Sequence, residues 1–376
     1  MIHNVEIPKA WSEPFTGGIK HPELYLWDAW SFERAGSWHL FCLAVNRFKA
    51  DASPLQPFER NAFPFHIRQF ISSDKGASWQ DAGVFQRSGE AKDGHDSRSI
   101  WSGGVLPLAT RGVLSAYTGI RQLDADHPFL QSLAVAASRD GAAVKPGSQS
   151  LLLCPQRDEN RLRQAGYYFA SREQMGSAAG EESGPVLAWR DPALFYDRLS
   201  DQSPLYTVWA AKACQRKPAV GMAKLRRQDD ADALSRIEVE ELFPPIHLPD
   251  ESEYSQIECP KILCDKKNGR YILLVATTTR YSEGQPDSEV SKKNRMYVSE
   301  ALTGPWRTAG SETSCIAGIE NQFGIEVLSA DFDRNELLCV AAYTEAAEGD
   351  LPLTFSPAFS IDISDLENIA SVSATN

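Results

Sequence analysis

The 376-residue sequence carries 50 acidic and 38 basic residues, which gives a formal net charge of -12. This balance, without a long basic run, argues against nucleic acid or an anionic membrane as a partner and favours a small neutral ligand. The first residues, MIHNVEIPKAWSEPF, lack the basic and apolar regions of a signal peptide, and no apolar run approaches about 18 residues. We therefore expect a cytoplasmic protein without a membrane span.

The metal- and cofactor-binding residue types show no recognisable spacing. The seven cysteines are odd in number and form no C-x-x-C pair, and the seven histidines form no HExxH motif. A P-loop and a G-x-S-x-G motif are also missing from the sequence. We predict no disulfide framework, no metal site and no cofactor.

The first strand pattern of the chain begins at residue 24. An apolar segment with a carboxylate inside it, LYLWDAWSFE, is followed by SWHLFCLAV at 37–45 and then by IRQFISSDKGASW. Runs of β-branched, aromatic and aliphatic residues bounded by Gly, Asn or Pro are typical of buried strands. The pattern therefore predicts three consecutive strands.

The same order of segments occurs four more times along the chain. The central runs lie at 111–119, 203–211, 269–277 and 335–343. The segments before them are SIWSGGVLPL, LAWRDPALFYD, SQIECPKILC and FGIEVLSADF, and no amphipathic helix longer than a few turns interrupts the series. Five units of three or four strands predict an all-β fold, a single five-bladed β-propeller over residues 1–376 with a central funnel-shaped site. A large β-sandwich, the alternative, does not account for five matching units.

The predicted innermost strands carry the polar residues of most interest. In a propeller these strands line the central channel and can aim side chains at one mouth. They begin with Asp28, Ser102, Asp191 and Glu258 in four successive blades, and the fifth offers Glu326 less clearly. Two carboxylates around one glycosidic bond are the minimum for glycoside hydrolysis, and a third can hold substrate hydroxyls. We expect Asp28, Asp191 and Glu258 to form a catalytic site.

Each of these residues also has a purely structural interpretation. Asp28 lies between two tryptophans, where a surface charge is hard to explain, but it can also cap a turn. Asp191 can form an ordinary salt bridge with Arg190, and we expect Pro192 to hold Asp191 extended. Ser102 has no base placed for it, so we interpret it as a hydrogen-bond partner rather than a nucleophile.

These motifs resemble those of glycoside hydrolase family 68, the levansucrases, inulosucrases and bacterial β-fructofuranosidases. LWDAW resembles the nucleophile block, WSGG the second pocket block, WRDP the transition-state-stabiliser block and SQIECP the acid/base block, while TTTRYS and MYVSEALTGPW resemble later blocks. The resemblance implies a retaining mechanism in which Asp28 attacks the anomeric carbon of a fructosyl unit, Glu258 protonates the leaving sugar and Asp191 holds fructosyl hydroxyls. It also implies a donor pocket that includes Trp27, Trp101, Ser102, Arg190, Gln256 and Arg280, although either tryptophan can be explained by core packing alone.

The chain departs from the family pattern around the acid/base. Gln256 stands where the family has a charged sugar-binding residue, and Ser255 stands where some members have an aspartate that serves a calcium site. We therefore do not predict calcium. The sequence ECP around Cys259 is similar to the related invertase family 32, whose members usually carry an additional β-sandwich domain that does not fit into this chain.

The prediction is a β-fructosidase or fructosyltransferase that acts on sucrose or a related β-fructoside. WDAW together with WSGG favours fructose over the sugars of arabinosidase-like propellers, and the three carboxylates disfavour a non-catalytic sugar-binding propeller. The short chain and the missing export signal favour hydrolysis or short transfer over polymer synthesis. The sequence leaves the leaving group and the choice between monomer and homodimer open.

Overall fold

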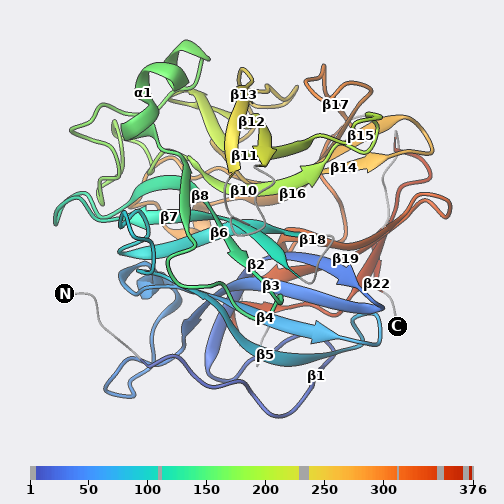
Figure 1. The fold of residues 1–376 in the computed structure, drawn as a ribbon, viewed down its shortest axis with the longest axis horizontal. Coiled ribbons are helices and arrows are strands. Elements are labelled where there is room, and N and C mark those ends of the chain that lie inside the picture. Colours follow the sequence, from blue (N-terminus) through green and yellow to red (C-terminus); the bar gives the residue numbers. More distant parts are fainter. Residues whose placement is uncertain are drawn as a thin grey trace.

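Five antiparallel β-sheets follow one another along the chain and surround a central axis (Figure 1). The computed structural model describes residues 6–108, 112–227, 237–310, 313–344, 351–366 and 372–374. Each sheet is one blade, with its first long strand innermost, so the predicted five-bladed propeller is confirmed.

The strands of the first three blades match the predicted runs. Blade 1 contains β1 (Phe15–Thr16), β2 (Leu24–Arg34), β3 (Ser37–Asn46), β4 (His66–Ser72) and β5 (Ser78–Arg87), in the order β2-β3-β4-β5-β1. Blade 2 contains β6 (Ser99–Pro107), β7 (Val113–Arg121), β8 (Leu130–Ser138) and β9 (Ser150–Leu153), and blade 3 contains β10 (Arg190–Tyr196), β11 (Leu205–Cys214), β12 (Lys217–Arg227) and β13 (Ile237–Leu242). The start of the second predicted central run, residue 111, lies outside the described residues.

The last two blades are built in the same way. Blade 4 contains β14 (Gln256–Asp265), β15 (Arg270–Thr278), β16 (Lys292–Ser299) and β17 (Arg307–Thr308). Blade 5 contains β18 (Gln322–Asp331), β19 (Glu336–Tyr343), β20 (Thr354–Phe355), β21 (Phe359–Asp362) and β22 (Val372–Ala374). Helical structure in the described residues is limited to α1 (Pro155–Gln164), η1 (Pro57–Ala62) and η2 (Asp287–Glu289), and none of these helices is long and apolar enough to span a membrane.

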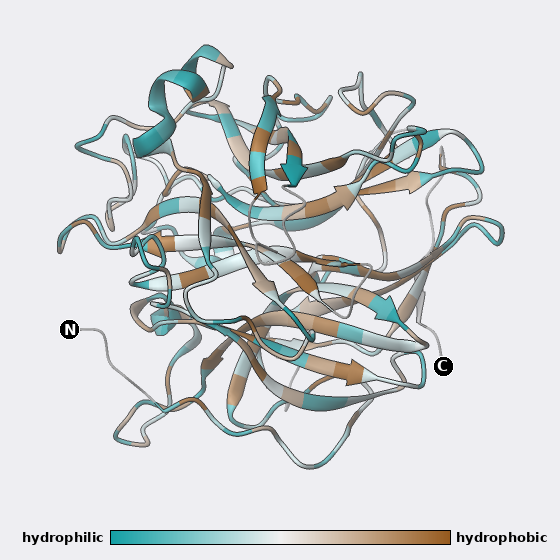
Figure 2. Ribbon diagram, viewed as in Figure 1, coloured by the Kyte–Doolittle hydropathy of each residue, from teal (hydrophilic) through white to brown (hydrophobic). Residues whose placement is uncertain are grey.

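The core lies within and between the blades. Hydrophobic residues concentrate on the strands, whereas α1 and many peripheral loops are hydrophilic (Figure 2). Every residue of β8 is buried, as expected for a strand covered on both faces. In blade 3 the indole of Trp209 packs so closely on Gly221 that a Cβ atom there would lie 2.1 Å from the ring.

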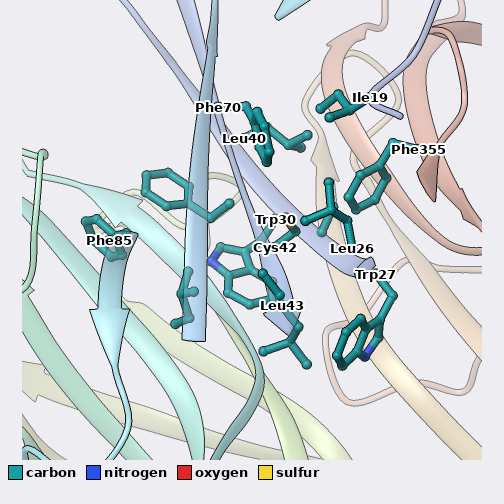
Figure 3. Packing of buried hydrophobic residues seen from close by; sticks show 14 of the residues in the cluster. Ile19, Leu26, Trp27, Trp30, Leu40, Cys42, Leu43, Phe70, Phe85 and Phe355 are labelled. Carbon is teal, nitrogen blue, oxygen red and sulfur yellow. The ribbon is translucent and has the colours of Figure 1, made fainter. Parts of the chain in front are cut away.

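The first and last blades are joined directly. Ile19 and Phe355 exchange backbone hydrogen bonds of 3.1 Å in both directions, and the amide of Leu26 donates to the carbonyl oxygen of Leu353 at 2.9 Å. Figure 3 shows the side chains of Ile19, Leu26 and Phe355 packed together. These contacts close the ring by joining the segment before β2 to the strands of blade 5.

Candidate active site

The innermost strand of every blade contains a β-bulge. The strand register breaks between Trp27 and Ala29, Trp101 and Gly103, Arg190 and Ala193, Glu258 and Lys261, and Phe323 and Glu326. A bulge leaves at least one residue unpaired and redirects its side chain. The five bulges therefore provide one redirected position per blade around the propeller axis.

The bulges correct the predicted alignment of the blades. The first unpaired residues are Asp28, Ser102, Asp191, Cys259 and Gly324, so Cys259 rather than Glu258 is the counterpart of Asp28. Glu258 lies one residue earlier, level with Trp27, Trp101 and Arg190. Asp28 also lies in the middle of β2 rather than at its beginning, because the bulge and not the strand end directs its side chain.

Positive backbone dihedrals mark four of the five bulges. The φ angles are 49° at Asp28, 62° at Asp191, 48° at Cys259 and 71° at Gly324. The expectation that Pro192 holds Asp191 extended is therefore wrong. Pro192 instead lies within the bulge, after Asp191. Because proline has no backbone N–H, the interrupted strand pairing there leaves no donor without a partner. A non-glycine residue in this region costs roughly 1–3 kcal/mol, a strain that is typically found at functional sites.

All nine residues predicted for the site line one cavity of about 180 Å³ at the propeller axis. They are Trp27, Asp28, Trp101, Ser102, Arg190, Asp191, Gln256, Glu258 and Arg280. A larger hollow of about 610 Å³ lies beside blade 1, but Glu6 is the one carboxylate among the residues that line it. The central cavity is therefore the better candidate for acid–base chemistry, and the individual roles of its residues stay predictions.

Asp28 is half-buried and lies next to Ser102. The Ser102 hydroxyl donates a short hydrogen bond to Oδ2 of Asp28. Burial raises the pKa of Asp28 from 3.8 to about 6; the Ser102 hydrogen bond opposes this rise, and the negative charge of Glu258 adds to it. Asp28 is thus mostly ionised at neutral pH and carries little stabilising solvation, as a carboxylate nucleophile requires.

Asp191 is fixed by neighbours from two other strands. Its backbone amide donates to Thr118 Oγ1 at 2.8 Å, and its Oδ2 accepts a hydrogen bond of 3.1 Å from the amide of Cys259. Burial raises the pKa of Asp191 to about 7, although the positive charge of Arg190 opposes the rise. The Asp28 and Glu258 charges raise it further, so the carboxylates act on one another across the cavity.

Glu258 is more accessible than Asp191, whose side chain is 5% exposed. The Glu258 side chain is 25% exposed, and its Oε1 lies 3.5 Å from Nη2 of Arg190. The same guanidinium has its Nε 3.8 Å from Oδ2 of Asp191, so Arg190 lies between two carboxylates. Glu326 does not line the cavity, and its less clear assignment to the pocket is wrong. Its side chain is paired with a lysine instead.

Gln256 and Arg280 differ in whether their polar side-chain groups have hydrogen-bond partners within the protein. Gln256 is 2% exposed, and neither its amide nitrogen nor its amide oxygen has a hydrogen-bond partner among the described residues. Arg280 donates to the carbonyl oxygen of Gln285 at 3.0 Å and pairs with Asp287. Because buried polar groups rarely stay unpaired, the free amide of Gln256 indicates a position for a ligand or a water molecule.

Several lining residues come from connecting segments and were not predicted from the sequence. Arg60, in η1, lies with its guanidinium carbon 5.6 Å from the centroid of the Trp27 ring. Phe129 packs against Trp101 with ring centroids 5.8 Å apart, and Glu283 accepts a hydrogen bond of 2.7 Å from the amide of Val186. Nothing local in the sequence distinguishes these residues from ordinary loop residues.

The described part of the chain contains no group of three or more His, Cys, Asp or Glu side chains arranged to hold a metal ion. The cavity is instead polar through four carboxylates and three guanidinium groups, and aromatic through Trp27, Phe65, Trp101 and Phe129. Carboxylates can transfer protons and form esters, guanidinium groups donate to hydroxyl oxygens, and indole rings stack on sugar rings. The arrangement is suited to a carbohydrate.

Comparison with solved structures identifies relatives of the fold. The inulosucrase from Halalkalicoccus jeotgali bound to kestose is 20% identical, with a TM-score of 0.66 over 100% of this chain and 93% of that chain. A variant of B. megaterium levansucrase is 15% identical, with a TM-score of 0.63 over 96% and 88% of the two chains. A levansucrase complexed with sucrose is 16% identical, with a TM-score of 0.61 over 94% and 87%. At these identities the likeness establishes the fold, which is that of levansucrases and inulosucrase.

No protein-family model and no curated protein sequence matches the chain.

Proposed function

We propose that the protein is a retaining β-fructosidase or fructosyltransferase that cleaves sucrose or a related β-fructoside. The observation that carries the proposal is the convergence of Asp28, Asp191 and Glu258 in one small cavity at the axis of a levansucrase-type propeller. Structural relatives bound to kestose or sucrose support a fructoside as the substrate.

In the proposed reaction Asp28 is the nucleophile. One of its carboxylate oxygens attacks the anomeric carbon of the fructosyl unit, and the bond from that carbon to the glycosidic oxygen breaks. Glu258 gives its proton to the departing oxygen, which leaves as a sugar hydroxyl. The Ser102 hydroxyl holds Asp28 in position and favours its ionised form.

The second half of the reaction reverses the role of Glu258. The Glu258 carboxylate takes a proton from water or from a sugar hydroxyl, and the resulting oxygen attacks the anomeric carbon and releases Asp28. Asp191 accepts hydrogen bonds from fructosyl hydroxyls throughout and stabilises the positive charge that develops on the ring. Two displacements at the same carbon return the original anomeric configuration.

The first test is incubation of the purified protein with sucrose while free glucose and free fructose are followed separately. Equal release is expected of a hydrolase, and glucose in excess is expected of a transferase. Replacement Asp28→Asn should abolish release, whereas Asp197→Asn, which changes a buried carboxylate outside the cavity, should not. Retained turnover in the Asp28→Asn variant would exclude Asp28 as the nucleophile.

A second test looks for the covalent intermediate. The Glu258→Gln variant, given a fructosyl donor with a good leaving group, should accumulate a fructosyl ester on Asp28 because the base for the second step is missing. Mass spectrometry of the digested protein locates the added mass. A product with inverted anomeric configuration, or an adduct on a different residue, would contradict the retaining mechanism proposed here.

A further inference from the structure

A largely enclosed lysine lies next to the bulge that carries Asp28. Lys261 is the first paired residue after the bulge of β14, and its counterparts in the other blades are Ala29, Gly103, Ala193 and Glu326. Three of these counterparts are small. The remaining two positions, Lys261 and Glu326, therefore form a charged pair at the level where the other blades contribute almost no side chain.

All three N–H groups of the Lys261 ammonium have acceptors. Nζ lies 2.8 Å from Oε2 of Glu326, and it donates to the carbonyl oxygens of Ala29 at 3.0 Å and Ile325 at 2.7 Å. The other oxygen of Glu326 accepts a 2.6 Å hydrogen bond from the Ser31 hydroxyl. The side chains of Lys261 and Glu326 are 13% and 7% exposed. A buried ion pair is stable only when its polar atoms are satisfied in this way.

The network joins three blades at the point where the ring closes. Lys261 belongs to blade 4, Ile325 and Glu326 to blade 5, and Ala29 and Ser31 to blade 1. The Ala29 carbonyl group belongs to the second peptide after Asp28, whose φ of 49° requires support from the surrounding structure. Lys261 therefore holds the backbone at the point where β2 resumes its pairing, immediately after the bulge that presents Asp28.

We infer that Lys261 is a positioning residue for the nucleophile: it fixes the bulge that presents Asp28 and places a compensated positive charge near the Asp28 carboxylate. This inference rests on the proposed function for its consequences in catalysis, but the effect on the Asp28 carboxylate does not depend on the substrate. Glu326 limits the positive charge that Asp28 experiences, and so the two members of the pair act on Asp28 in opposite directions.

The other groups that face Asp28 differ from Lys261 in their charge or in their position relative to the cavity. They are Ser102 from β6, Asp191 from β10, Glu258 and Cys259 from β14, Cys42 from β3 and Arg60 from η1. Among them Arg60 is the one other cation, and it lines the cavity whereas Lys261 does not. The positive charge of Lys261 lowers the pKa of Asp28 against the effect of burial.

The test compares Lys261→Met with Glu326→Gln. Lys261→Met removes the positive charge while keeping a side chain of similar length, so the acid limb of the pH profile of kcat/KM should move to higher pH. Loss of the bulge support should also lower kcat about tenfold to a hundredfold with little change in KM. Glu326→Gln leaves the lysine charge uncompensated and should move the acid limb to lower pH. A role in folding alone predicts no shift of the limb in either variant.

A matched control removes an ion pair from the far end of the same strand pair. Asp265 and Arg270 lie 2.9 Å apart outside the cavity, so Arg270→Gln should leave the acid limb in place. If the Lys261→Met variant does not fold, the double variant Lys261→Met with Glu326→Met is measured in its place. The double variant removes both charges together, and replacing a whole buried ion pair destabilises a protein less than removing one partner. In this double variant the lower kcat is still expected.

A readout without substrate separates this inference from the proposed function. The Cγ resonance of Asp28, labelled with 13C and assigned by its loss in Asp28→Asn, reports the pKa of that carboxyl directly by NMR titration. The pKa should rise in Lys261→Met and fall in Glu326→Gln. Unchanged titration in both variants overturns the inference about Lys261, whereas failure of the unmodified protein to cleave any β-fructoside overturns the proposed function alone.

Discussion

Replacement of Asp191 by asparagine should make the protein more stable and inactive. The folded structure raises the pKa of Asp191 from 3.8 to about 7, chiefly through burial. One pKa unit corresponds to about 1.4 kcal/mol, so the ionised carboxylate opposes folding by roughly 4 kcal/mol once the pH exceeds 7. Asparagine removes that charge, and its side-chain oxygen can still accept the hydrogen bond from the amide of Cys259.

The stabilisation by Asp191→Asn should depend on pH. A carboxyl group with a raised pKa in the folded state is neutral there below its unfolded value, so no penalty exists below about pH 3.8. The penalty grows as the pH rises and is complete above the folded value of about 7. Asp191→Asn should therefore stabilise at pH 8 and lose its advantage near pH 4.

Thermal unfolding measured by calorimetry or circular dichroism tests this expectation. For 376 residues the unfolding entropy is about 0.8 kcal/mol per kelvin, so the full effect corresponds to roughly 5 °C in Tm at pH 8. Asp265→Asn serves as the control, because the Asp265 carboxylate is paired with Arg270 and accepts a hydrogen bond from Asn268, and its removal should lower Tm. An Asp191→Asn protein that is folded but no more stable than the parent at pH 8 would refute the reasoning.

Three further outcomes follow from the structure. Ser102→Ala removes a hydrogen bond that lowers the pKa of Asp28, so the acid limb of kcat/KM, expected near pH 6, should move to higher pH in initial-rate measurements; an unmoved limb contradicts the assignment. Arg60→Gln removes a cation from the cavity wall and should lower kcat/KM for sucrose about tenfold to a hundredfold, the usual effect of losing a charge-assisted hydrogen bond; unchanged steady-state kinetics would exclude a substrate contact. Gly221→Ala forces a methyl group onto Trp209 and should destabilise by about 1–3 kcal/mol, whereas Gly284→Ala, with open space around it, should not; equal Tm values in the two variants contradict the packing argument.

The strands were predictable because burial leaves a strong local signal. Each blade is covered by its neighbours, so strands such as β8 and β15 each contain an uninterrupted run of five aliphatic residues, LAVAA and ILLVA. Five repetitions of that pattern admit few arrangements other than a propeller. The convergence of the three carboxylates in one cavity follows from the same logic, since all three lie on innermost strands.

The bulges were not predictable with the same accuracy. A bulge shifts the register by one residue, and that shift decides whether Glu258 or Cys259 corresponds to Asp28. Proline after Asp191 and after Cys259 was the available signal, because proline cannot donate to the strand ladder. The expectation of an extended Asp191 before Pro192 overlooked this signal.

Contacts between distant segments were beyond local inference altogether. Arg60 and Phe129 reach the cavity from connections whose paths depend on the finished fold. The pairing of Lys261 with Glu326 depends on how blades 4 and 5 meet, and neither residue stands in a motif. Such residues show no periodic pattern in the sequence, because their contacts depend on the tertiary structure and not on the residues next to them in the chain.

Closure of the ring also sets the order in which the site is completed during synthesis. Asp28 leaves the ribosome with the first blade, but the ammonium group that binds the Ala29 carbonyl oxygen comes from a residue 232 positions after Ala29. At about 5–20 residues per second, that interval lasts roughly 10–50 s. The contact of Ser31 with Glu326 spans a further stretch, 295 positions in all. We expect the nascent first blade to display its aspartate in a relaxed, poorly oriented bulge, so that catalytic competence arises in one late step when the fifth blade docks.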